Sequence, residues 1–220
     1  MKTSMTRFAA LLIGAALCVN AAADTAPAGT LPSAISRIQQ AWAEAAYQTP
    51  EKQQEAAFKT LAEDAHRVTA AYPDRAEPMI WEAIVLSGYA KAAGGLSALG
   101  MVKQARDLLL AAEQIDARAL NGLVFTSLGS LYYKVPGWPI SFRDNDKARA
   151  YLEKALAANP NGIDPNYFYG DFLFNQKDYQ GAAVALRRAL TAPPRPGRSL
   201  ADNGRRAEIE KELKEVEAKL

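Results

Sequence analysis

The chain has 220 residues, with 26 basic residues, 24 acidic residues, one histidine and one cysteine. This near-neutral balance lacks the basic excess of nucleic-acid binders, so we expect no nucleic-acid partner. A single histidine and a single cysteine also supply too few nitrogen and sulfur ligands for a zinc site.

Residues 1–23 have the features of a cleaved export signal. Lys2 and Arg7 make a positive start, residues 8–19 form an apolar run too short to span a bilayer, and three alanines offer a cleavage site. A lipid-modified cysteine needs a small residue before it, but Leu17 precedes Cys18, so we do not expect a lipoprotein. The mature chain would then lie in the periplasm, without cysteine and without disulfides.

Residues 24–30 form a short tail rich in small residues, and helical periodicity begins after it. Thr49 and Pro50 are predicted to cap and open the second helix. The Gly94-Gly95 pair is predicted to end the third helix, and residues 96–101 are interpreted as an insertion. The expected helices up to this point cover residues 31–48, about 50–72, 77–93 and 102–115.

The segment 163–194 carries the most informative pattern. Asp164 is expected to cap a helix in which Gly170 lies near the middle. Glycine there costs about 1 kcal/mol relative to alanine, which indicates a close packing contact. Ala182 and Ala189 follow on the next helix, where small side chains would let the pair cross closely.

The same spacing recurs upstream. Ala148 lies one 34-residue period before Ala182, and Gly129 stands in the first-helix signature Phe125-x-x-Leu128-Gly129. This pattern resembles the tetratricopeptide repeat. The resemblance implies an all-α, tetratricopeptide-like solenoid of helical hairpins over residues 31–220, with its last two repeats at about 119–160 and 163–194. The predicted packing residues are Gly129, Ala148, Ala155, Gly170, Ala182 and Ala189.

Residues 133–142 contain two prolines and a glycine, and they are predicted to form a long loop. Trp138 in this loop would either pack on the protein's own surface or contact a partner. We leave both interpretations open.

A last helix is predicted at about residues 201–218, with Ser199 and Asp202 as a capping box. Its apolar residues Ile209, Leu213 and Val216 form a narrow stripe. We favour a cap over the end of the solenoid, and the alternative is a coiled-coil contact in a homo-oligomer.

The sequence contains no set of residues suited to catalysis. His66 is the only histidine, and no G-x-S-x-G motif is present. The polar turns near Asp144 and Asn159 do not complete a calcium loop, and no P-loop lysine follows Gly94-Gly95. We therefore expect no enzyme, no cofactor and no metal.

What remains is a concave surface, which the first helix of each hairpin would line. Residues off the glycine face of those helices should point into it. They are Met79, Glu82, Leu86 and Tyr89, then Thr126, Ser130, Tyr133 and Lys134, then Tyr167, Asp171, Phe174 and Asn175. The residues selected as a binding site for a partner or ligand are Tyr89, Tyr133, Trp138, Tyr167, Asp171 and Phe174. Their aromatic rings favour an extended peptide or an apolar ligand.

Four segments resemble a more particular family. The runs LYYKVPGWP at 131–139, SFRDNDKA at 141–148, NYFYGDF at 166–172 and APPRPGRSLAD at 192–202 are similar to the T-component family. Its members are periplasmic tetratricopeptide proteins associated with TRAP-type transporters. The resemblance implies a helper that oligomerises, contacts a solute-binding protein and holds an apolar ligand. Two function classes therefore stay open: a non-enzymatic adaptor for a partner protein, and a binding protein for an apolar small molecule or lipid of the cell envelope.

Overall fold

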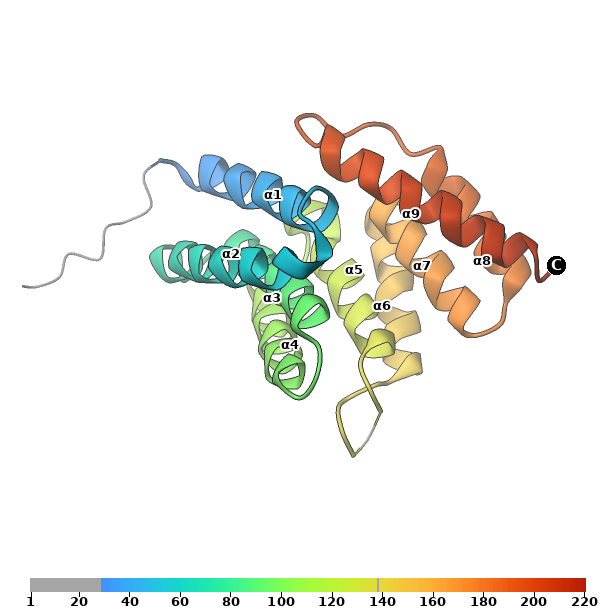
Figure 1. The fold of residues 1–220 in the computed structure, drawn as a ribbon, viewed down its shortest axis with the longest axis horizontal. Helices are drawn as coiled ribbons and strands as arrows, with labels where there is room; N and C mark the ends of the chain where they lie inside the picture. The colour runs from blue at the N-terminus through green and yellow to red at the C-terminus, as the bar shows by residue number, and fades with distance from the viewer. Residues whose placement is uncertain (1–28, 138) are drawn as a thin grey trace, which may run out of the picture.

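A computed structural model describes residues 29–137 and 139–220. The predicted export signal, residues 24–28 of the tail and Trp138 lie outside these residues. The described part of the chain consists of nine α-helices without a strand (Figure 1). The predicted all-α fold is therefore confirmed.

The helices follow one another as antiparallel hairpins. Their bounds are α1 Leu31–Tyr47, α2 Glu51–Ala71, α3 Ala76–Ala93, α4 Ser97–Asp116, α5 Ala119–Lys134, α6 Asn145–Ala158, α7 Ile163–Asn175, α8 Tyr179–Leu190 and α9 Ser199–Glu217. Helices α1, α3, α5 and α7 pack side by side as an inner layer, and each is followed by its outer partner. No helix in the ranges described is long and apolar enough to cross a membrane.

The last helix returns to the first. Helix α9 packs against α8 and α7, and it also contacts α1 (Figure 1). The five helices α1, α3, α5, α7 and α9 therefore contact one another in a cycle. Ile209 and Val216 of the predicted stripe are fully buried, whereas Leu220 is exposed. The helix thus covers the last hairpin, and it also joins the two ends of the inner layer.

Two glycines allow the hairpins to close tightly. A Cβ atom built on Gly129 would lie 2.6 Å from Cγ of Leu152, and one on Gly170 would lie 2.8 Å from Cγ of Leu186. Both leucines are fully buried. A third contact of this kind joins Gly88 of α3 to the Phe58 ring of α2. The remaining predicted packing positions, all with no exposed surface, are Ala148, Ala155, Ala182 and Ala189.

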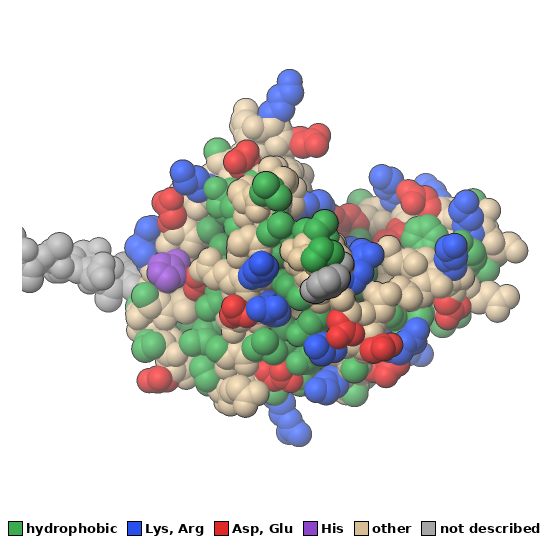
Figure 2. Space-filling model, turned by 90° about the horizontal axis from the view of Figure 1, so that it is seen from below, with side chains coloured by type: hydrophobic (Ala, Val, Ile, Leu, Met, Phe, Trp, Pro, Cys, Tyr) green, Lys and Arg blue, Asp and Glu red, His purple; other side chains and the backbone are tan. Residues whose placement is uncertain are grey.

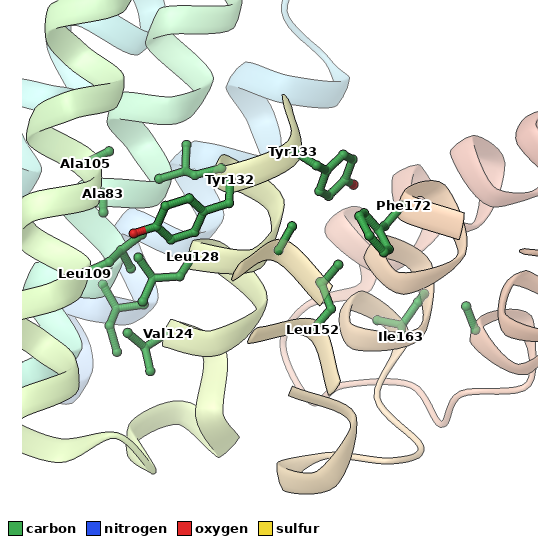
Figure 3. Packing of buried hydrophobic residues seen from close by; sticks show 14 of the residues in the cluster. Ala83, Ala105, Leu109, Val124, Leu128, Tyr132, Tyr133, Leu152, Ile163 and Phe172 are labelled. Carbon is green, nitrogen blue, oxygen red and sulfur yellow. The ribbon is translucent and has the colours of Figure 1, made fainter. Parts of the chain in front are cut away.

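The core continues from hairpin to hairpin through α5. Figure 3 shows Tyr133 of α5 directed toward Phe172 of α7, whereas Tyr132 points the other way. The Tyr133 and Phe172 ring centroids lie 5.5 Å apart, and Tyr132 stacks on Tyr151 of α6 at 5.8 Å. Adjacent residues of one helix therefore serve two different interfaces.

Two expected loops are shorter than predicted. Helix α4 begins at Ser97, so residues 96–101 are mostly its first turns and not an insertion. Alanine, leucine and methionine in this stretch are strong helix formers, which explains the longer helix. Helix α5 runs to Lys134, because burial of Tyr133 against α7 extends it into the predicted loop.

Three predicted caps are wrong. Thr49 Oγ1 donates to the carbonyl of Glu44, and Pro50 occupies the N-cap position of α2. Asp164 lies inside α7, and α9 already begins at Ser199, so Ser199 and Asp202 form no capping box. The carboxylates of Asp164 and Asp202 accept from Arg195 instead. An arginine that is charged and partly buried offers them a stronger, charge-assisted partner than a backbone N–H.

Candidate functional site

The concave face encloses a groove with a volume of about 780 Å³. Its lining comes from helices α1 to α5, from α7, from the segment before α9 and from the first half of α9. The apolar part of the wall includes Trp42, Phe58, Ile84, Leu99 and Leu123. A cavity of this size with mostly apolar walls suits a bound peptide segment or a small molecule.

Charged side chains form the wall of the groove near α9. Arg195 Nη1 donates to Asp164 Oδ2 at 2.6 Å, and Arg205 Nε donates to Asp164 Oδ1 at 2.9 Å. Burial alone would raise the pKa of Asp164, but the charges of Arg205 and Arg195 lower it to about 2. Arg195 also donates to Asp202 at 2.6 Å. These ion pairs tie α7, α9 and the segment between α8 and α9 together.

Contacts between α1 and α9 close the groove on one side. Tyr47 of α1 donates from its hydroxyl to Glu208 Oε2 at 3.2 Å, and Arg205 Nη1 donates to the same oxygen at 2.6 Å. A Cβ atom on Gly204 would lie 2.4 Å from the Tyr47 ring. The absence of a side chain at Gly204 thus permits the close approach of α9 to α1.

A second cavity, of about 580 Å³, lies between α7 and α9. Its walls include Tyr167, Asp171, Phe174 and Glu212. Burial, with the negative charge of Asp171, raises the pKa of Glu212 to about 7, although the nearby Lys134 opposes this shift. Helix α9 therefore separates part of the predicted binding surface from the main groove.

The structure divides the selected site residues. Tyr167 lines both cavities, and Asp171 and Phe174 line only the second. Tyr133 differs from the expectation: it is buried, with 3% of its surface exposed, and its hydroxyl donates to Asp171 Oδ2 at 2.8 Å. Tyr89 is partly buried and lines neither cavity. Trp138 lies outside the described residues.

Of the other residues expected in the groove, some line it and others are buried between helices. Thr126, Ser130 and Lys134 line the main groove, whereas Glu82 and Leu86 are buried in the hairpin interfaces. Periodicity could not distinguish these sets, because α3 and α5 are apolar on most of their circumference.

The sequence did not indicate most of the groove lining, and Trp42 and Arg198 are two examples. Trp42 seemed to belong to an ordinary terminal helix, and Arg198 to a linker. Both line the groove because α9 folds back to α1. The basic, proline-rich run around Arg198 was the available signal, but charge alone favours a solvated face.

His66 makes a structural contact. Its Nδ1 atom lies 2.9 Å from Oε1 of the buried Glu82, while its side chain is 68% exposed. Across residues 29–137 and 139–220, no group of three or more His, Cys, Asp or Glu is placed to hold a metal ion.

The outer surface carries mixed charge. Figure 2 shows basic and acidic side chains interspersed with apolar ones on the face seen there, without one dominant basic patch.

Comparisons with known proteins support the helical-repeat assignment. Residues 140–198 match the tetratricopeptide repeat family. The crystal structure of a thermophilic tetratricopeptide protein of Thermus thermophilus is similar at 15% identity, over 83% of this chain and 100% of that chain, with a TM-score of 0.54. PilF of Pseudomonas aeruginosa is similar at 18% identity over 84% and 93%, with a TM-score of 0.35. No curated protein matches the chain. Residues 140–198 are thus similar to tetratricopeptide repeats, and the described residues have a tetratricopeptide-like solenoid fold.

Proposed function

We propose that this protein is a non-enzymatic adaptor of the periplasm that binds a partner protein in its concave groove. The observation that carries the proposal is the groove itself, about 780 Å³ in volume and lined by the inner helices. Tetratricopeptide solenoids present such concave faces as extended binding surfaces.

The proposed setting is solute uptake by a TRAP-type transporter. Its support is the resemblance of residues 131–202 to the T-component family, which suggests a periplasmic solute-binding protein as the partner. The export-signal pattern of residues 1–23 supports the periplasmic location. The single Cys18 would be removed with that signal, so the mature protein would carry no lipid.

Site-specific photo-crosslinking in intact cells tests the proposal. A crosslinking amino acid at Ser130, which lines the groove, should capture a solute-binding protein. The same amino acid at Glu153, exposed on the outer helix α6, is the matched control and should not. Capture from both positions, or from Glu153 alone, would refute a groove-bound partner. N-terminal sequencing of the periplasmic fraction should find a mature chain that starts at Asp24.

A second candidate is a binding protein for an apolar small molecule. The observation that favours it is the closure of the inner layer by α9, which walls the groove on the side of α1. Native mass spectrometry of the purified protein would detect such a ligand as an added mass.

A further inference from the structure

Among the described residues, one arginine of the groove makes no ion pair with a carboxylate. Among the residues described, Arg195 and Arg205 pair with Asp164, Asp202 and Glu208. Arg198 lies between them in sequence and lines the same groove, yet it forms no ion pair within the described chain.

One donor of the Arg198 guanidinium is buried without an acceptor in the part of the chain described. Its Nε atom is buried without a hydrogen-bond partner among the described residues. Its guanidinium carbon lies 5.1 Å from the centroid of the Trp81 ring, which orients the cation but accepts no conventional hydrogen bond. Burial and repulsion by Arg195 lower the pKa of Arg198, although Asp164 and Asp202 oppose this. A charge held in this way is costly unless an anion joins it.

Two more donors among the described residues that line the groove lack acceptors. The indole Nε1 atoms of Trp42 and Trp81 are buried without a partner in the part of the chain that the structure describes. The two rings pack edge to face with centroids 6.5 Å apart. These three N–H groups therefore leave positive potential uncompensated at one place in the groove.

Away from the charged wall, the groove is lined mainly by apolar side chains, with polar ones such as Ser87, Thr126 and Ser130 among them. Ile84, Leu99, Val102, Leu123 and Leu131 line it away from the charged wall. The complementary ligand thus has one negative group and an apolar body. A phosphate dianion fits less well, because the neighbouring arginines already hold carboxylates of the protein.

We propose that Arg198 anchors the carboxylate of an amphipathic organic acid, whose apolar body lies in the groove against α3, α4 and α5. The planar guanidinium fork matches a carboxylate in bidentate geometry. This inference deepens the second candidate function and rests on the same groove.

Isothermal titration calorimetry with decanoate and decanamide tests the assignment. The two probes share an apolar chain and differ in charge. The parent protein should bind decanoate at least tenfold more tightly than decanamide, because only decanoate pairs with Arg198. Arg198→Gln should weaken decanoate binding at least tenfold and leave decanamide binding unchanged, and Arg198→Lys should restore part of the difference. A tenfold change corresponds to about 1.4 kcal/mol.

Arg187→Gln is the matched control. Arg187 of α8 is exposed, pairs with Glu217 of α9, and lies outside the groove lining. This variant should bind decanoate like the parent. Equal binding of both probes, no binding of decanoate by the parent, or unchanged decanoate binding in Arg198→Gln would overturn the inference. Urea unfolding of each variant separates a lost contact from a lost fold.

The outcome is independent of the adaptor proposal. Crosslinking from Ser130 to a partner would persist if decanoate failed to bind. Decanoate binding would persist if no partner were captured.

Discussion

Helices α7 and α8 approach closely at Gly170, and substituting this glycine tests the repeat packing directly. A Cβ atom there would lie 2.8 Å from Cγ and 3.3 Å from the backbone nitrogen of Leu186. The Leu186 side chain has no exposed surface and the backbone nitrogen cannot rotate away, so the helices must separate.

The expected cost follows from two opposing terms. Alanine favours the helix over glycine by about 1 kcal/mol, whereas overpacking of a core costs about 1–3 kcal/mol. Gly170→Ala should therefore destabilise by about 1 kcal/mol, and Gly170→Leu by about 3 kcal/mol. For a chain of this size, 1 kcal/mol lowers Tm by about 2–4 °C.

Gly100 of α4 provides the matched control. It is helical and exposed, and a Cβ atom there would meet nothing within 4 Å. Gly100→Ala should therefore stabilise by about 0.5–1 kcal/mol. Urea unfolding followed by circular dichroism measures all three variants. If Gly170→Ala stabilises as Gly100→Ala does, the proposed crossing at Gly170 is refuted.

Three further predictions concern polar contacts. Asp164→Ala should destabilise by about 2 kcal/mol, because two partly buried arginines each lose one of their two carboxylate partners, whereas Asp107→Ala on an exposed pair should cost below about 1 kcal/mol in the same urea titration. The pKa of Glu212 rises from 4.5 to about 7 on folding, so its contribution to the free energy of unfolding is complete below pH 4.5 and is lost as the pH rises through 7. After allowance for screening by solvent, this loss of stability is about 1 kcal/mol, and Glu212→Gln should abolish the pH dependence. Tyr133→Phe should cost about 1 kcal/mol, because the buried bond to Asp171 is lost, and a thermal melt with no shift would contradict this.

The hairpins were predictable because their determinants are local. The recurrence of small residues at Gly129, Ala148, Gly170 and Ala182 indicates which helix faces meet, and the structure packs a buried leucine against each of the two glycines. Helix ends were harder to predict. Asp164 has the residue type of a cap, but a distant arginine competes for its oxygens, and sequence spacing carries no information about that arginine.

The groove was only partly predictable, because its wall depends on a contact between the two ends of the chain. Tyr47 and Glu208 are 161 residues apart, and nothing in either helix alone indicates that they meet. The tetratricopeptide pattern predicts an open, curved solenoid, in which Arg198 would lie in a solvated linker. Because α9 returns to α1, this arginine instead lies beside Trp81. Phe174, which was predicted to line the main groove, lines the second cavity.

That closure is itself testable at Gly204. A Cβ atom there would lie 2.4–2.6 Å from three atoms of the Tyr47 ring, so a larger side chain must push α9 away from α1. Gly204→Val should lengthen the distance between spin labels placed on exposed positions of α1 and α9, while the helical circular dichroism signal stays unchanged because each hairpin keeps its own core. Gly100→Val, at an open position of α4, should leave that distance as in the parent. An unchanged distance in Gly204→Val would mean that the contact between α1 and α9 does not depend on this glycine.

If the contact between α1 and α9 also shapes the proposed carboxylate site at Arg198, Gly204→Val should weaken decanoate binding even though Arg198 is intact. The reason is that Trp42 of α1 would no longer face the wall that Arg198 forms.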